Sequence, residues 1–288
     1  MRVLVTGGSG RIGAATVKDL LAHGYSVVNA DRRPLDASDL FKNGDYQFRE
    51  VDLTDVGHVA GAMAGCEAVI HLGAIPSPGR HPDEVVFGNN VRGTFAVLQT
   101  ASLLGVKKAL IASSLSALGT AWAPEPFPPR YAPVDEAHPL LNHDCYGLSK
   151  EVDERTAEMF HRRTGMQVVV HRFCLVAPMD DVHRHVESVR RAPGDVEHWR
   201  VLWAYIDVRD AATACRLGIE ADGLGFEVFT ITAADTLSDT PTEELLRQYT
   251  PSVEIRQPIP GAASAFSIEK ARRLLGYVPA FSWRLRGE

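Results

Sequence analysis

Strand-like and helix-like segments alternate along this chain from its first residues, and this alternation limits the fold more than any other feature. Short apolar runs recur between segments whose apolar residues have helical spacing. The strand-like runs lie at residues 2–6, 25–30, 46–51, 68–71, 108–112 and 167–176, and the helix-like segments at 11–23, 56–63, 85–104 and 146–163. Strands separated by helices form βαβ units, so we predict an α/β fold with a doubly wound parallel sheet.

The first strand-like run leads into a glycine motif with the spacing G-x-x-G-x-x-G. The motif comprises Gly7, Gly10, Arg11, Ile12 and Gly13. Glycines at a strand-to-helix turn allow a tight turn and a close approach of the backbone to a pyrophosphate, while helix N–H groups face the phosphate. The context of the motif therefore predicts a Rossmann-type, dinucleotide-binding domain.

An acidic residue ends the second strand-like run. Asp31 follows the glycine motif at a separation where a carboxylate can hydrogen-bond an adenosine ribose. Its charge would repel a 2′-phosphate, so Asp31 favours NAD as the cofactor. Arg32 and Arg33 follow directly and could bind a 2′-phosphate, which leaves NADP as the alternative.

A tyrosine and a lysine stand one helical turn apart in segment 146–163. Tyr146 and Lys150 therefore lie on one face of the predicted helix. A phenol is a poor base at neutral pH, and a nearby ammonium group stabilises its phenolate form. Tyr146 could then take a proton from a substrate hydroxyl as hydride leaves the carbon, or donate one in reverse. The alternative is an exposed Tyr/Lys pair without a catalytic role.

Two serines follow the strand-like run 108–112. The carboxyl ends of parallel strands face the ligand-binding crevice, so we expect Ser114 to point toward the region of the glycine motif. A hydroxyl there could hydrogen-bond the reacting oxygen. A proline-rich segment, residues 122–133, then precedes Tyr146, and we expect it to form a stiff loop over the site.

Charge and composition exclude several other classes. The 288 residues include 30 Lys and Arg against 36 Asp and Glu, a formal net charge of −6, and the basic residues do not cluster. Nucleic acid and an anionic membrane surface are therefore not expected as partners, and no apolar run approaches the ~18 residues that span a bilayer. Met1 leads directly into residues 2–6 without a signal peptide, so we expect a cytoplasmic location.

The remaining polar residues of note are candidates for metal or substrate binding. The four cysteines form no C-x-x-C pair. A cluster that could bind a metal comprises Asp180, Asp181, His183 and His185, but we expect a solvated segment and no metal. Candidate substrate contacts are Trp122, Glu125, Arg130 and Tyr131. Candidate binders of a carboxylate or phosphate, with surface charge as the alternative, are Arg184, Arg190 and Arg200.

The regular pattern loosens beyond Pro178. Further helices are predicted at 183–191, 211–221, 242–249 and 267–275, and further strands at 226–232 and 253–255. We therefore predict a cofactor-binding domain at residues 1–177 that includes the Tyr/Lys helix, and a smaller C-terminal α/β substrate lobe at 178–288. Chain segments can interleave between the two.

Taken together, these motifs resemble a known family in order and approximate spacing. The matching residues are Thr6-Gly7-x-x-Gly10-x-x-Gly13, Asp52-Leu53, His71-Leu72-Gly73-Ala74, Asn90-Val91-Arg92-Gly93-Thr94, Ser113-Ser114, Tyr146-x-x-x-Lys150, Arg172 and Tyr205-Ile206-Asp207-Val208-Arg209-Asp210. They resemble the extended short-chain dehydrogenase/reductase superfamily, and within it the NAD-dependent epimerase/dehydratase group. That family often dimerises through the helices matching 85–104 and 146–163, so we expect a homodimer.

The resemblance implies roles for individual residues. Ser114, Tyr146 and Lys150 would form the catalytic triad, with Tyr146 and Lys150 also touching the cofactor. The other implied cofactor-binding residues are Gly7, Gly10, Arg11, Ile12, Gly13, Asp31, Arg32, Asp52, Leu53, Leu72, Gly73, Ala74 and Asn90. In the family, Asp52 and Leu53 would lie by the adenine and Asn90 near the nicotinamide. Because Ala112 replaces the first serine of the family's serine triple, Ser113 and Ser116 are alternatives to Ser114.

Departures from the family pattern narrow the expected reaction on a small-molecule substrate. Leu115-Ser116 stand where nucleotide-sugar dehydratases carry an Asp-Glu pair, which argues against dehydration. Only residues 179–204 separate Pro178 from Tyr205, which is short for a nucleotide-diphosphate pocket. We expect an NAD-dependent oxidoreductase that transfers hydride at a hydroxyl carbon of a sugar, sugar acid or polyol. An NAD-dependent sugar epimerase with transient oxidation is the first alternative, and a non-catalytic dinucleotide sensor the second.

Overall fold

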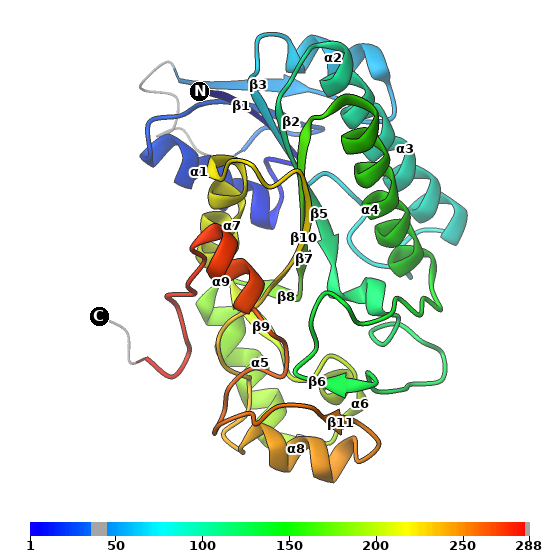
Figure 1. Ribbon diagram of the computed structural model, residues 1–288, viewed down its shortest axis with the longest axis vertical. Coiled ribbons are helices and arrows are strands. Elements are labelled where there is room, and N and C mark those ends of the chain that lie inside the picture. Colours follow the sequence, from blue (N-terminus) through cyan, green and yellow to red (C-terminus); the bar gives the residue numbers. More distant parts are fainter. Residues whose placement is uncertain (36–44, 286–288) are drawn as a thin grey trace.

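One parallel sheet forms the centre of the computed structural model, which describes residues 1–35 and 45–285 (Figure 1). Within these residues seven strands form the sheet in the order β10-β7-β5-β4-β1-β2-β3. Their bounds are β1 Arg2–Thr6, β2 Ser26–Asp31, β3 Tyr46–Glu50, β4 Ala68–His71, β5 Lys108–Ser114, β7 Gln167–Phe173 and β10 Phe226–Ile231. The strand order runs outward from β1 in both directions, so the predicted doubly wound α/β fold is confirmed.

Helices cover both faces of the sheet. Their bounds are α1 Arg11–Ala22, α2 Val56–Met63, α3 Asp83–Leu103, α4 Cys145–Thr164, α7 Val208–Glu220 and α9 Glu269–Leu275. α1, α7 and α9 share one apolar core with Val3 and Val5 of β1, and α2, α3 and α4 share another with Leu4. Successive side chains of a strand point to opposite faces. The continuous apolar runs in the sequence thus reflect strands that are buried on both faces.

A second, smaller layer lies beyond the carboxyl ends of β5 and β7. Its elements are the 3₁₀ helix η2 Leu115–Leu118, β6 Tyr131–Ala132, β8 Leu175–Ala177, α5 Met179–Arg191, α6 Val196–Trp199, β9 Tyr205–Asp207, α8 Thr242–Tyr249 and β11 Glu254–Ile255. β8 pairs with β9 and β6 with β11, each in parallel. A third apolar core, with Trp203 and Tyr205 fully buried, holds these elements together.

The sequence segments and the spatial units do not coincide. From the segment that follows Pro178, β10 pairs with β7 in the central sheet, and α7 packs beside α1. The chain then returns to the smaller layer through α8 and β11 before α9 packs again on the sheet. Residues 178–288 therefore contribute to both parts of the molecule.

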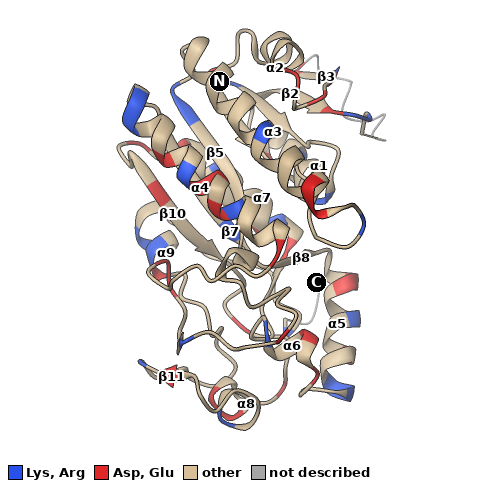
Figure 2. Ribbon diagram, turned by 90° about the vertical axis from the view of Figure 1, so that its right-hand side faces the viewer, with Lys and Arg blue, Asp and Glu red and all other residues tan. Residues whose placement is uncertain are grey.

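Two predicted elements need correction. The β-rich run predicted over 167–176 forms two strands that separate at Cys174: β7 stays in the central sheet, whereas β8 pairs with β9. The helix expected at 183–191 begins four residues earlier, at Met179. Its first turn carries Asp180 and Asp181, whose charges suit a helix N-terminus but interrupt the apolar periodicity. Figure 2 shows the acidic start and basic end of α5.

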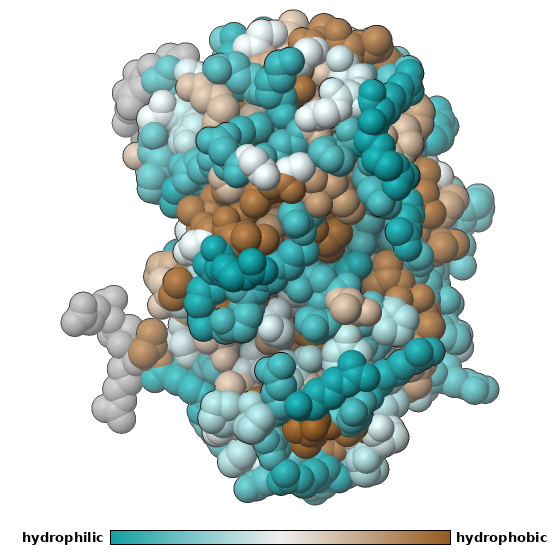
Figure 3. All heavy atoms as spheres, viewed as in Figure 1, coloured by the Kyte–Doolittle hydropathy of each residue, from teal (hydrophilic) through white to brown (hydrophobic). Residues whose placement is uncertain are grey.

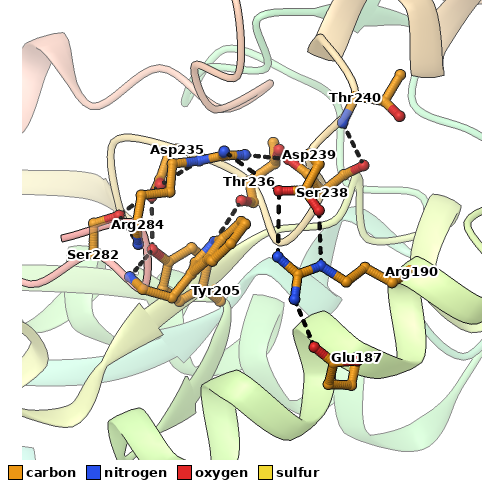
Figure 4. A network of polar contacts seen from close by, with 11 residues as sticks. Glu187, Arg190, Tyr205, Asp235, Thr236, Ser238, Asp239, Thr240, Ser282 and Arg284 are labelled. Atoms are coloured by element: carbon orange, nitrogen blue, oxygen red, sulfur yellow. Dashed lines mark hydrogen bonds and ion pairs between the residues drawn. The ribbon is translucent and has the colours of Figure 1, made fainter. Parts of the chain in front are cut away.

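The carboxyl-terminal residues tie the smaller layer together. Asp235 accepts a hydrogen bond from Ser282 Oγ at 2.7 Å and pairs with Arg284, while Tyr205 donates its hydroxyl hydrogen to the same carboxylate (Figure 4). The indole N–H of Trp283 donates to the carbonyl of Thr236 at 2.9 Å. Among the helices of residues 1–35 and 45–285, none has the length and apolar character needed to cross a bilayer.

Candidate active site

The glycine motif forms a closed turn between β1 and α1. Gly7 has φ +65°, a conformation that L-residues with a Cβ rarely adopt, and a Cβ there would lie 2.6 Å from the amide nitrogen of Gly73. A Cβ on Gly13 would lie 2.1 Å from the carbonyl oxygen of Gly7. Gly10 is the N-cap of α1 and provides no side-chain cap. The first N–H groups of α1 therefore have no side-chain acceptor and can face an anion.

Asp31 lies beside this turn, at the end of β2. Its Oδ2 accepts a hydrogen bond from the backbone N–H of Ser9 at 3.0 Å, and its Oδ1 accepts one from the N–H of Arg32 at 2.6 Å. Ser9 also donates its hydroxyl hydrogen to the carbonyl of Arg33 at 2.6 Å. The carboxylate is thus oriented by the glycine turn, while the Arg32 side chain is exposed.

The loop that follows β4 closes the other side of the turn. The amide of Leu72 donates to the carbonyl of Thr6 at 3.1 Å, and the amide of Gly73 to the Thr6 hydroxyl at 3.3 Å. A Cβ on Gly73 would lie 2.3 Å from a methyl group of Leu53. Asp52 accepts hydrogen bonds from the N–H and hydroxyl of Thr54, which lower the pKa of its carboxyl group. Gly7, Leu53 and Gly73 therefore meet at one place.

Asn90 acts on this loop from α3. Its side chain is buried, and its amide oxygen and nitrogen bond the backbone N–H and carbonyl of Ile75 at 2.8 and 3.1 Å. Its nitrogen also donates to the Ser149 hydroxyl on α4 at 3.1 Å. Because Asn90 on α3 bonds both Ile75 and Ser149 of α4, it fixes the loop of Ala74 and Ile75 to these two helices.

Tyr146 and Lys150 lie in the first two turns of α4. Asp144 caps this helix, accepting a hydrogen bond from the Gly147 N–H at 2.7 Å. Tyr146 is 8% exposed, and the Lys150 Nζ lies 5.9 Å from the centre of its ring. Lys150 is 3% exposed and donates to the carbonyl of Ala112 at 2.9 Å. The lysine thus connects α4 to the end of β5.

The two serines at the end of β5 have different surroundings. Ser113 is buried and donates its hydroxyl hydrogen to Glu154 at 2.6 Å. Ser114 is partly exposed, accepts a hydrogen bond from the Ser116 N–H at 3.0 Å and lies 3.5 Å from the carbonyl of Phe173. Because the side chains of a strand alternate, the two hydroxyls point to opposite faces. The Ser113 hydroxyl is bonded to Glu154 on α4, whereas the Ser114 hydroxyl caps η2.

A buried ion pair supports this region, and the motifs did not indicate it. Arg172 of β7 donates from Nε and Nη2 to the two oxygens of Glu154, each at 2.8 Å. Both side chains are 6% exposed. Bidentate guanidinium–carboxylate contacts fix geometry as well as charge. Glu154 and Asp153, the carboxylates in the turn after Lys150, were missed because acidic residues on a helix usually face solvent.

The three arginines predicted as candidate anion binders lie in different surroundings. Arg184 pairs with Asp181 one turn away on α5, and Arg190 pairs with Glu187 and Asp239 on the surface of the smaller layer (Figure 4). The side chain of Arg200 is 11% exposed. Its guanidinium lies 5.5 Å from the ring centre of Trp122 in the proline-rich segment.

The other candidate substrate contacts in the proline-rich segment differ in exposure. The side chain of Tyr131 is buried in β6, donates to Asp135 and lies under Arg256, whereas Glu125 and Arg130 are exposed. The four residues of the candidate metal cluster lie along α5: Asp180, Asp181, His183 and His185. Within residues 1–35 and 45–285, no group of three or more His, Cys, Asp or Glu side chains gathers in a way that could hold a metal ion.

Comparison with known proteins reveals relatives of similar and of greater length. NAD-dependent glucose-6-phosphate dehydrogenase of Haloferax volcanii is 28% identical over 283 residues, which cover 96% of this chain and 92% of that protein. UDP-glucose 4-epimerase 4 of Oryza sativa subsp. japonica is 29% identical over 185 residues, or 59% of this chain. The match spans only 48% of that epimerase.

Solved structures share the fold over nearly the whole chain. A short-chain dehydrogenase/reductase superfamily protein from Agrobacterium tumefaciens with bound NAD superimposes with a TM-score of 0.73 at 22% identity, covering 98% of this chain and 94% of that one. The sequence profile of the NAD dependent epimerase/dehydratase family matches residues 3–231. This range includes the glycine motif, the Tyr/Lys helix and β10, and it confirms the resemblance and NAD as the cofactor of the family. The chain belongs to the NAD-dependent epimerase/dehydratase family.

Proposed function

We propose that this protein is an oxidoreductase that transfers hydride between NAD and a hydroxyl carbon of a sugar, sugar acid or polyol. The observation that carries the proposal is the position of Tyr146 and Lys150. They share one face of α4, and Lys150 is bonded to the end of β5, the strand that leads to Ser114. The carboxyl ends of β5 and β1 lie on the same edge of the parallel sheet, so this face and the glycine turn adjoin one crevice.

The residues at the glycine turn fit NAD. The uncapped start of α1 and the tight backbone turn that Gly7, Gly10 and Gly13 allow suit a pyrophosphate, with Arg11 and Ile12 in the first turn. The Asp31 carboxylate suits the adenosine ribose hydroxyls and opposes a 2′-phosphate. Leu53, Asp52 and the loop of Leu72, Gly73 and Ala74 complete the adenosine side.

In the proposed mechanism the chain's own residues handle the proton. NAD, when held at the glycine turn, would supply the acceptor for a hydride from the substrate carbon. Tyr146 removes the hydroxyl proton at its phenolic oxygen, and Ser114 holds the same substrate oxygen by a hydrogen bond. The Lys150 ammonium, bound to the Ala112 carbonyl, places a positive charge 5.9 Å from the centre of the Tyr146 ring. Asn90 keeps the loop after β4 in place beside these groups.

The length of the smaller layer favours a substrate without a nucleotide. Residues 179–204 fold into α5 and α6 and leave little chain for a diphosphate pocket. Arg200, whose guanidinium pairs with Glu197, meets Trp122 between α6 and the proline-rich segment, where a negatively charged group of a sugar could take the place of the Glu197 carboxylate. The relative with nearly full coverage carries the name of a dehydrogenase that acts on glucose 6-phosphate, an anionic sugar. We propose that the substrate binds between the cofactor-binding part built on the central sheet and the smaller layer, to which residues 178–288 contribute α5, α6, β9, α8 and β11.

Epimerisation is the second candidate, because the rice relative is a UDP-glucose 4-epimerase. The two reactions differ in the fate of the hydride. A screen of free sugars, sugar acids, sugar phosphates and polyols with NAD or NADP, followed at the absorbance of reduced nicotinamide, separates them. We expect net NADH formation with an anionic sugar and weaker activity with NADP. A product epimer without net NADH would favour the epimerase. No turnover with any compound would favour the non-catalytic sensor.

We also propose a homodimer formed through α3 and α4. Val85, Phe95 and Leu148 are exposed on these helices, and Figure 3 shows hydrophobic side chains along the edge that α3 and α4 form. A charge at such a site would oppose association. We expect Phe95→Glu to shift the molar mass measured by light scattering from that of a dimer to that of a monomer. Val278→Glu, at an exposed apolar residue elsewhere, is the control. A monomeric wild-type protein would contradict the proposal.

A further inference from the structure

A buried carboxylate that none of the sequence motifs includes lies one helical turn beyond Lys150. Asp153 is 1% exposed, and its Oδ2 accepts a hydrogen bond from the Lys150 Nζ at 3.2 Å. The Nζ has a second acceptor, the carbonyl of Ala112, at 2.9 Å. An ammonium group removed from water keeps its charge only where protein groups replace its hydration. Asp153 supplies the negative charge in this pair.

We propose that Asp153 is a positioning residue for the reaction: it keeps the Lys150 ammonium charged and fixed beside Tyr146. The proposal rests on the proposed function, because Lys150 belongs to the same site. Asp153 acts through Lys150 and does not itself touch substrate or cofactor. Its role follows from the two contacts of the Nζ: the Ala112 carbonyl joins it to β5, and Asp153 holds it from within α4.

The other charged and titratable groups around Lys150 do not replace Asp153. They are Tyr146 and Glu154 on α4 and His71 on β4. Glu154 is already paired with Arg172 through both of its oxygens.

His71 is neutral near physiological pH. Burial, together with the charge of Lys150, lowers its pKa to about 3. Its two ring nitrogens contact the hydroxyls of Thr6 and Thr94 at 2.7 and 3.1 Å. His71 therefore adds no second positive charge beside the lysine, and its position is fixed by β1 and α3.

The electrostatics agree with this geometry. Burial by itself lowers the pKa of Lys150, but the charges of Asp153, Tyr146 and Glu154 outweigh burial, and the pKa rises above its ordinary value of 10.5. Without the Asp153 charge, burial would be opposed only by more distant or already paired groups. The pKa of Lys150 should then fall, and the lysine would lose its proton in the alkaline range.

The test is an NMR titration of the Lys150 ammonium in protein labelled with ¹⁵N-lysine, without cofactor or substrate. The Nζ signal is assigned by its loss in Lys150→Arg. We expect wild-type Lys150 to stay protonated up to pH 10.5, and Asp153→Asn to lower the titration midpoint by more than one pH unit. Glu158→Gln is the matched control, because Glu158 is a carboxylate on the same helix that pairs with surface arginines. Equal midpoints in wild type and Asp153→Asn would overturn the proposal.

A kinetic readout complements the titration once a substrate is known. We expect the alkaline limb of the kcat profile to move to lower pH in Asp153→Asn, with KM little changed, and Asp153→Glu to restore it in part. An alkaline limb that stays in place would count against the proposal. The titration needs no turnover, so it can succeed or fail independently of the proposed function, which is tested by the substrate screen.

A folding failure of Asp153→Asn would also be informative. Removing one partner of a buried ion pair leaves an uncompensated charge, and removing both does not. If Asp153→Asn does not fold, we expect Lys150→Met/Asp153→Asn to regain cooperative thermal unfolding. A double variant as unstable as Asp153→Asn alone would show that Asp153 does not act through Lys150, and the proposal would be wrong.

Discussion

The glycine turn is formed by residues close in sequence and is then closed by the loop after β4, whereas the smaller layer is held together throughout by residues far apart. In the turn, Gly13 packs on Gly7, and the Ser9 N–H bonds Asp31. At the smaller layer, contacts join the start of α7 on the central sheet and the loop after β10 to the carboxyl-terminal residues, some seventy positions apart at Asp210 and Ala280. A local motif can be recognised in a sequence, but a contact over such a separation cannot. This difference explains why the cofactor is easier to predict than the substrate.

The largest expected effect tests the chemistry beside the glycine turn. Tyr146→Phe removes the proton-transferring hydroxyl, and a positioned general acid or base contributes about 10²–10⁴-fold to a rate. We expect kcat to fall by about that factor while NAD affinity changes little, measured by steady-state kinetics and calorimetry. Tyr25→Phe, which loses a hydroxyl bonded to Glu220 on the α7 side, is the control. Unchanged turnover in Tyr146→Phe would exclude the proposed mechanism.

The second prediction concerns the turn itself. Gly13→Ala places a Cβ 2.1 Å from the Gly7 carbonyl oxygen, so the backbone must move. We expect a loss of about 3 kcal/mol in the free energy of unfolding and at least a tenfold weaker NAD affinity. Gly61→Ala is the matched control: Gly61 lies inside α2 with no atom within 4 Å of an added Cβ. That change should stabilise the protein by about 0.5–1 kcal/mol.

The third prediction tests the long-range contacts. Asp210 is buried at the start of α7, and its carboxylate accepts hydrogen bonds from the N–H groups of Ala280 and Phe281 at 2.9 and 3.0 Å. We expect Asp210→Ala to cost about 2 kcal/mol, since two N–H groups lose their acceptor. Substrate KM should rise while NAD affinity stays within twofold of wild type. If NAD affinity fell as much as substrate affinity, the proposed separation between a cofactor-binding glycine turn and a substrate-binding smaller layer would be contradicted. The control is Asp180→Ala, because Asp180 is exposed.

The smallest effect compares two buried histidines of the central sheet. Burial lowers the pKa of His171 to about 3, as it does for His71. Below pH 6.5 each histidine is protonated in the unfolded chain, but in the folded chain it is protonated only below about pH 3. As the pH is lowered through this range, the free energy of unfolding therefore decreases by about 1.4 kcal/mol per pH unit for each histidine.

The two histidines differ in their partners. Within residues 1–35 and 45–285, the ring nitrogens of His171 have no hydrogen-bond partner, whereas those of His71 contact two threonine hydroxyls. We expect His171→Leu to leave stability at pH 7 nearly unchanged and to reduce the acid dependence measured by denaturant unfolding. His71→Leu should reduce the acid dependence too, but unlike His171→Leu it should also lower the stability of the protein at pH 7. A His171→Leu variant with the wild-type acid dependence would show that the ring is protonated in the folded protein.

Sequence reasoning predicted the sheet and the glycine turn correctly, and it failed where partners come from distant segments. The strand–glycine–helix pattern predicted the turn of Gly7 and Gly13, and the four-residue spacing put Tyr146 and Lys150 on one helix face. Strand β9 was missed, because three residues do not make a periodic pattern and its pairing with β8 is a tertiary event. The contact of Arg200 with Trp122 depends on the meeting of two loops, which spacing does not encode.

The central claim is that hydride passes from the substrate carbon to NAD. The direct measurement uses the substrate found by the screen, with deuterium at the reacting hydroxyl carbon, and mass spectrometry of the reduced cofactor. We predict one deuterium per reduced nicotinamide, together with slower turnover of the deuterated substrate. Reduced cofactor without deuterium, or oxidised substrate without reduced cofactor, would contradict the account.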